Sequence, residues 1–109
     1  MINNLSQNTI VSKTYSYKTG VSKIQGLLLK KQPETLVFKT RFGIHTFFMK
    51  FPIDVMVLNK NKKVVFLKES VKPNKFVLWN PKYNLILEMP IGSIKESKTK
   101  IGDYIDVDL

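Results

Sequence analysis

The chain has 109 residues, a common size for one domain, and we expect a single domain over residues 1–109. It contains no cysteine, which excludes disulfides and thiolate metal sites. Its longest apolar runs are four residues, far short of the roughly 20 that span a bilayer. The start, MINNLSQNTIVSK, lacks the pattern of a signal peptide, and we therefore expect a soluble cytoplasmic protein.

The formal net charge of +10 makes this a basic protein, and residues 1–50 hold eight basic groups but one acid. Such a balance attracts nucleic acid or an anionic membrane surface. However, Arg41 is the only arginine among 18 basic residues, and arginine is the side chain that binds phosphate through two parallel hydrogen bonds. A lysine-rich surface also serves solubility, so both interpretations stay open.

The chain has no alanine and many β-branched and aromatic residues, a composition that favours strands. Residues 9–17 alternate loosely and predict a first strand. Thr19 is placed to cap a short helix that runs to about Lys30, before Pro33. Residues 35–40 predict a second strand, followed by a turn at 41–43.

The clearest hairpin joins residues 53–58 to residues 63–68. Its turn, 59–62, contains Asn61, which we expect to adopt the left-handed conformation that glycine usually provides. Both hairpin strands are apolar on nearly both faces, which is typical of strands buried on two sides. Alternation along the first strand predicts two sets of side chains, Ile53, Val55 and Val57 on one face and Asp54, Met56 and Leu58 on the other.

Further along, residues 71–83 predict a proline-rich loop or irregular strand, and 85–89 an apolar strand. Residues 90–96 predict a turn with a single helical turn, and 104–107 a last strand. The predicted fold is mainly β (β-rich α+β). It is a small antiparallel barrel or sandwich of six to seven short strands with one or two short helices.

Several motifs occur in one order: Gly26-Leu27-Leu28, HTFFMKFPIDV from His45, Lys63-Val64-Val65, LEMPIG from Leu87 and Ile101-Gly102-Asp103. From about residue 20 onward the chain resembles the family called domain of unknown function 192. The resemblance implies a compact β-rich fold, without an established reaction, cofactor or partner. Family members are cytoplasmic or exported, and this chain resembles the cytoplasmic kind. It departs from the family pattern at Leu29-Lys30, at the 59–62 turn and at Asn74.

Two carboxylates stand within apolar runs, and burying a charge is costly unless it is paired. Asp54 either accepts hydrogen bonds from nearby backbone N–H groups or from Thr46, or acts as a general base or ligand anchor. Glu88 either faces solvent or pairs with a lysine such as Lys50, or it lines one pocket with Asp54.

His45 is the sole histidine, and with Asp54 and Glu88 it would complete a hydrolase-like or metal-binding set. No local spacing resembles a metal motif, no serine lies in a nucleophile elbow, and no glycine-rich phosphate loop is present. We therefore expect no metal and no cofactor, and catalysis is not favoured. A hydrolase that uses Asp54 or Glu88 with His45 remains one alternative.

Aromatic and basic residues alternate between positions 72 and 82, where Lys72, Lys75, Phe76, Trp79 and Lys82 stand. Aromatics interleaved with lysines stack bases and follow phosphates in single-stranded nucleic-acid binders. The same pattern arises when aromatics pin a long loop onto a core.

The function favoured by the sequence is a non-catalytic binding module with a polar-lined cleft. Its candidate ligand-binding residues are His45, Thr46, Lys50, Asp54 and Glu88. The partner would be an unidentified small ligand or protein. Single-stranded nucleic-acid binding through the Lys72–Lys82 segment is the first alternative.

Overall fold

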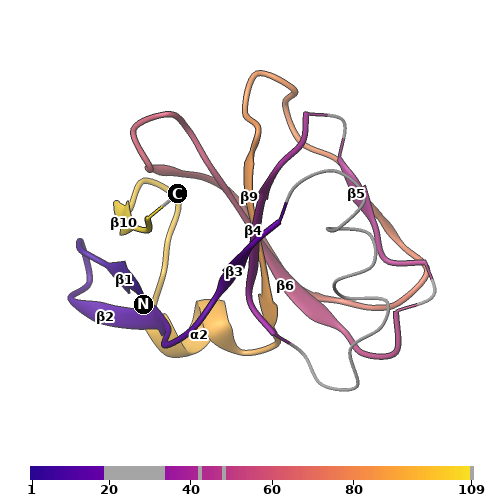
Figure 1. Cartoon of the computed structure of the whole chain (residues 1–109), viewed down its shortest axis with the longest axis horizontal. Coiled ribbons are helices and arrows are strands. Elements are labelled where there is room, and N and C mark those ends of the chain that lie inside the picture. The colour runs from indigo at the N-terminus through magenta and orange to yellow at the C-terminus, as the bar shows by residue number, and fades with distance from the viewer. Residues whose placement is uncertain (19–33, 42, 48, 109) are drawn as a thin grey trace.

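The computed structural model of the chain describes residues 1–18, 34–41, 43–47 and 49–108. Within them, ten strands form three sheets, and one short helix packs beside the strands (Figure 1). The β-rich α+β class is therefore confirmed. The predicted helix between Thr19 and Lys30, together with the Gly26-Leu27-Leu28 motif, lies outside the described residues.

The central sheet has five strands, and its neighbours are antiparallel except for the parallel pair β3 and β4. In spatial order they are β3 (Ser16–Tyr17), β4 (Leu36–Lys39), β9 (Leu85–Pro90), β6 (Ile53–Leu58) and β7 (Val64–Val71). All six residues of β6 are buried, because other elements cover both faces of the sheet. This explains why the strand reads as a nearly continuous apolar run.

One face of the central sheet packs against the chain termini. Here β1 (Ile2–Asn4) pairs with β2 (Thr9–Ser12) and with β10 (Ile105–Asp106), and α2 (Ser93–Ser97) lies alongside β2. The core on this side contains Ile2, Val37, Met56, Leu58, Leu87 and Met89. In Figure 1 the three-stranded sheet and α2 lie on one side of the central strands.

The other face packs against a two-stranded sheet, in which β5 (Ile44–His45) pairs with β8 (Phe76–Val77). The core on this side contains Leu36, Phe38, Ile53, Val55, Val57 and Ile86. The two sets of side chains predicted for β6 therefore separate into two different cores, as alternation along a strand requires.

A polar cluster ties the N-terminal hairpin to the segment after α2. The Asn4 amide donates hydrogen bonds of 3.0 Å to Asp103 Oδ2 and to Thr99 Oγ1, and Gln7 Nε2 donates to Asp103 at 3.1 Å. The Lys100 N–H adds a bond of 2.9 Å to the same Asp103 oxygen. Since Asn4 and Asp103 are 99 residues apart, this cluster joins the two ends of the described chain.

Three details differ from the sequence expectations. In the part of the chain that the structure describes, the central sheet has two edges, β3 and β7, and does not close into a barrel. The described residues form ten strands rather than six or seven, because pieces of two to four residues are too short to show a period. The predicted strand 9–17 is divided between two sheets, since β2 and β3 have different partners.

The hairpin turn is also built differently from the expectation for Asn61. The left-handed residue is Lys62, with φ of 63°, and not Asn61. The turn is held by Asn59, whose Oδ1 accepts hydrogen bonds from the N–H groups of Asn61 at 2.9 Å and Lys63 at 3.0 Å. An asparagine side chain that bonds to the backbone two residues on is a common turn device.

Candidate functional site

The carboxylate of Asp54 is fully buried and bonds to backbone on two sides. Its Oδ1 accepts a hydrogen bond from the Ser70 N–H at 2.9 Å, and Oδ2 accepts one from the Ile94 N–H at 3.0 Å. Ile94 lies in the first turn of α2, where N–H groups lack an intrahelical acceptor and the cap residue, Gly92, supplies no side chain. Asp54 therefore supplies an acceptor to this helix from the neighbouring strand.

The bond to Ser70 follows from a β-bulge. β7 has two residues, Glu69 and Ser70, between the partners of Ile53 and Val55, so both face Asp54 alone. Ser70 has a left-handed φ of 53°, which is strained for a residue other than glycine. Asp54 thus occupies the bulge and satisfies the N–H that the broken ladder leaves free.

Glu88 lies on the opposite face of the sheet from Asp54. It pairs with Val55 of β6, whereas Asp54 pairs with Met89. Residues directly opposite each other in an antiparallel pair point to the same face, so Glu88 shares a face with Val55 and Asp54 shares one with Met89. The two carboxylates therefore do not line one pocket. Glu88 is 4% exposed, so the solvent-facing interpretation is wrong.

Thr46 fastens a loop. Its hydroxyl donates a hydrogen bond to the Lys72 carbonyl at 2.7 Å and accepts one from the Lys75 N–H at 2.9 Å. Its backbone N–H donates to the Lys75 carbonyl at 2.8 Å, and its carbonyl accepts from the Asn74 N–H at 3.0 Å. With every polar group of Thr46 engaged and the side chain buried, this residue positions the 72–75 loop.

The remaining two candidates of the sequence-derived cleft are exposed. The His45 ring stacks at a tilt on Phe47, with ring centroids 5.1 Å apart. Lys50 extends into solvent. Thus the structure places His45 at the surface, Asp54 in one core and Glu88 against the other. Among the described residues, no three His, Asp or Glu side chains gather as a metal-binding group.

A different set of polar residues converges at one end of the central sheet. The register places Leu58 of β6 and Lys39 of β4 on either side of Leu85, the first residue of β9. One step further out, the Thr40 N–H donates to the Asn84 carbonyl at 2.9 Å. The residues that follow β4 and β6 and precede β9 must therefore meet at this end.

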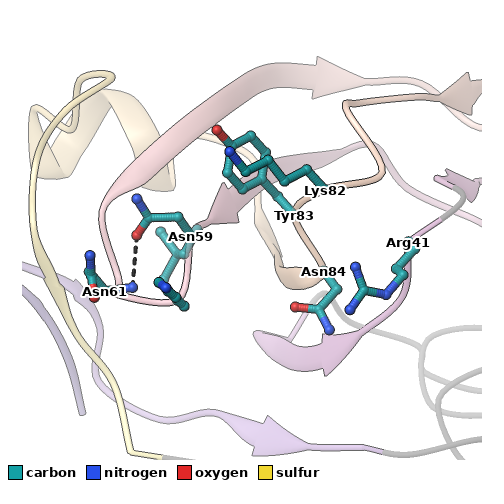
Figure 2. A pocket seen from close by; sticks show the side chains of 8 residues that line it. Arg41, Asn59, Asn61, Lys82, Tyr83 and Asn84 are labelled. Carbon is teal, nitrogen blue, oxygen red and sulfur yellow. Dashed lines mark hydrogen bonds between the residues drawn. The ribbon is translucent and has the colours of Figure 1, made fainter.

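These residues enclose a pocket with a volume of about 390 Å³ (Figure 2). Its lining consists of Arg41, Leu58, Asn59, Lys60, Asn61, Lys82, Tyr83 and Asn84. Three of the eight carry a positive charge, three carry an amide, and none is a carboxylate. The lining therefore offers hydrogen-bond donors and positive charge to a bound group.

Arg41 is anchored within this pocket. Its Nη1 donates a hydrogen bond of 3.2 Å to the Pro81 carbonyl, which uses one of the five donors of the guanidinium. Figure 2 shows the side chains of Arg41 and Asn84 lying toward each other at one end of the pocket, with Lys82 alongside the ring of Tyr83. The Lys82 ammonium is 5.9 Å from that ring's centroid. Sequence reasoning noted Arg41 only as the sole arginine, because its neighbours in the pocket come from distant segments.

The residues of the nucleic-acid alternative separate into two groups. Phe76 is 68% exposed, and its ring meets Phe47 edge-on with centroids 4.8 Å apart. Trp79 is half-buried against the core, and its Nε1 donates a hydrogen bond of 2.8 Å to the Tyr83 carbonyl. Trp79 therefore pins the loop, while Phe76 remains at the surface. Lys72, Lys75 and Lys82 are exposed.

One carboxylate outside these sites has a shifted pKa. Burial by itself raises the pKa of Asp103. Hydrogen bonds from Asn4, the Lys100 N–H and Gln7, together with the charge of Lys100, lower the pKa by more than burial raises it. The net pKa lies below the usual value of 3.8, so this group stays ionised.

The fold and the pocket define a small β-rich α+β protein with a basic pocket at the end of its central sheet. The family model DUF192 (Uncharacterized ACR, COG1430) matches residues 5–107. The chain therefore belongs to the DUF192 family, as its motifs indicated. No helix among the described residues is long and apolar enough to cross a membrane.

The chain is similar to archaeal proteins named UPF0127. The chain is 33% identical over 92 residues to the UPF0127 protein PF1050 of Pyrococcus furiosus, a match that covers 79% of this chain and 78% of that protein. It is 36% identical over 95 residues to a UPF0127 protein of Thermococcus sibiricus, covering 81% of this chain and 61% of the relative. The chain thus spans less than two thirds of the Thermococcus protein.

A solved structure shows the same fold. The crystal structure of a protein of unknown function from Novosphingobium aromaticivorans superposes with a TM-score of 0.72 at 15% sequence identity. The match covers 85% of this chain and 72% of that one. At this level of identity the likeness concerns the fold alone.

Proposed function

We propose that this protein is a non-catalytic binding module, and that the pocket lined by Arg41, Lys60 and Lys82 binds an anionic group of its ligand. The observation that carries the proposal is the composition of the pocket, with three cations from three separate segments and no carboxylate. Phosphate is the anionic group that best matches an arginine fork supported by lysines and amides.

The size and donors of the pocket support this proposal. Ligand pockets commonly measure about 300–1,000 Å³, and this one measures about 390 Å³. The side-chain amide of Asn84 and the ammonium group of Lys60 make no hydrogen bond to the part of the chain that the structure describes. These donors are therefore available to a bound anion without breaking a hydrogen bond within residues 1–18, 34–41, 43–47 and 49–108.

The placement of the titratable groups favours binding over catalysis. A general acid–base pair needs two groups within hydrogen-bond reach of one reacting atom. Here Asp54 bonds to backbone in one core, Glu88 lies on the other face of the sheet, and His45 is at the surface. The hydrolase alternative lacks such a pair among these three residues.

Isothermal titration of the full chain with inorganic phosphate and pyrophosphate at low salt tests the proposal. We expect pyrophosphate to bind more tightly than phosphate, and Arg41→Ala to weaken that binding about tenfold or more, the usual effect of losing a charge-assisted hydrogen bond. Lys68→Ala removes an exposed lysine of β7 outside the pocket and serves as the control. Equal affinities for Arg41→Ala and the parent, or no binding by the parent, would overturn the proposal.

A further inference from the structure

Two segments without any acidic residue, 35–53 and 70–87, lie side by side in this protein. Each contains three cations, and all six of these side chains are exposed. The pairs Ile44 with Val77 and His45 with Phe76 join the two segments in the β5–β8 sheet. A third of the chain's 18 basic residues therefore gathers here without a compensating carboxylate from either segment.

At the same sheet lies a surface ridge of three rings and one leucine, which we define as His45, Phe47, Phe76 and Leu78. Phe76 and Leu78 are each 68% exposed, although both are large apolar side chains. Contacts of 5.1 Å and 4.8 Å between ring centroids link His45 to Phe47 and Phe47 to Phe76. Because the buried Thr46 holds the loop beneath with two side-chain hydrogen bonds, the ridge is a preformed surface.

The ridge and the basic pocket lie close together. Arg41 precedes His45 by four residues, a span of at most about 14 Å for an extended chain. Between them, Gly43 lies against Leu78, where an added Cβ would come within 2.7 Å of Leu78 Cδ2. On the other segment, Lys75 directly precedes Phe76, and Lys82 lies in the pocket. One extended polyanion can therefore contact both features.

We propose that the anionic ligand is single-stranded nucleic acid, with a base stacked on Phe76 and phosphates held by the lysines and by the Arg41 pocket. This inference rests on the proposed function, because the pocket supplies one of the phosphate sites. Exposed aromatic rings beside lysines are the arrangement by which proteins bind single strands without sequence preference. An acidic polypeptide would match the charge, but it would not require an aromatic ring at position 76.

The test compares two strands of equal charge, of which only one has bases. Fluorescence anisotropy measures the affinity of the full chain for an end-labelled oligothymidylate of about 12 nucleotides and for an abasic strand of the same length. We expect the parent to prefer the strand with bases about tenfold, since stacking adds about that much per base. Affinity for both strands should fall steeply with salt, as counterion release requires.

Substitution of the ridge separates stacking from charge. Phe76→Ala and Phe76→Leu should both remove the preference for bases while changing the affinity for the abasic strand less than about twofold, because no charge is lost. Tyr104→Ala is the matched control, since Tyr104 is another exposed aromatic (47%) with a lysine over its ring, on the opposite layer. It should leave the preference intact.

The outcomes distinguish this inference from the proposed function. If the parent binds pyrophosphate but shows equal affinity for the two strands, the proposed function is supported and the nucleic-acid inference is overturned. Tighter binding of polyglutamate than of oligothymidylate would overturn it in favour of an acidic polypeptide. A preference for bases that survives in both Phe76 variants would also overturn it. Failure to bind pyrophosphate at all would instead contradict the proposed function.

Discussion

Glu88 pairs with Val55 across β6 and β9, while Asp54 pairs with Met89, and this register sends the two buried carboxylates to opposite faces of the central sheet. A shift of one residue would have placed both on one face, since side chains alternate along each strand. With this register, Asp54 and Glu88 cannot form one site on a single face of the sheet. The candidate pocket lies instead at the end of the sheet, where the side chains of Arg41 and Asn84 lie toward each other (Figure 2).

Asp54 is expected to be a major determinant of stability. Asp54→Ala would leave the N–H groups of Ser70 and Ile94 without their acceptor. The bond to Ile94 is buried and the bond to Ser70 is partly buried, and an unsatisfied buried donor costs about 1–3 kcal/mol. We expect a loss of about 3 kcal/mol in the free energy of unfolding, measured by urea denaturation followed by circular dichroism. Glu69→Ala, an exposed acidic neighbour in the same bulge, should change it by less than about 0.5 kcal/mol. Equal effects of the two substitutions would contradict the assigned role.

The left-handed backbone of Ser70 predicts that the stability of the protein depends on which residue replaces it. Its φ of 53° suits glycine, whereas a β-branched residue is strongly disfavoured there. Ser70→Gly should raise the free energy of unfolding by about 0.5 kcal/mol, after the entropy cost of glycine, and Ser70→Val should lower it by about 1 kcal/mol. Thermal denaturation of the three proteins checks this order, and a Ser70→Gly variant less stable than the parent would argue against strain at this bulge.

Asp103 should make folding sensitive to acid. Its pKa is lowered in the folded protein, so its stabilisation is complete above the ordinary value of 3.8 and is lost as the pH falls from there through the folded-state pKa. Asp103→Asn should therefore be less stable than the parent near neutral pH, and the difference should shrink below pH 3.8. Urea denaturation at several pH values measures this. Asp106→Asn, at an exposed position in β10, is the control, and a difference for Asp103→Asn that stayed constant with pH would refute the linkage.

Thr46 is expected to control the order of the 72–75 loop. Thr46→Val keeps the shape of the side chain but removes the hydroxyl that bonds to the Lys72 carbonyl and the Lys75 N–H. We expect a loss of about 2 kcal/mol in stability and faster hydrogen exchange at the Lys75 amide. Thr14→Val, at an exposed position, should change neither quantity. Unchanged exchange at Lys75 in Thr46→Val would show that the loop is held by other contacts.

Much of the strand content could be predicted, because it depends on local pattern. Residues 53–58 form β6 as expected, and the division of its side chains between two faces is confirmed by the two cores. The same alternation operates in β9, where Leu87 and Met89 lie in one core and Glu88 points to the other face. Short pieces such as β5 escaped prediction because two residues carry no period, and their strand character comes only from the partner strand.

The sequence by itself determined the β-rich class, the family, and which neighbours along each strand share a face, because these follow from composition, motif order and alternation. Only the tertiary structure decided which face of one strand matches which face of the next. That choice depends on register and on the bulge at Ser70, which are set by pairing between distant segments. The tertiary structure also decided that one pocket contains Arg41, Lys60 and Lys82, which come from three separate segments. Strand ends lie together only when the sheet is formed.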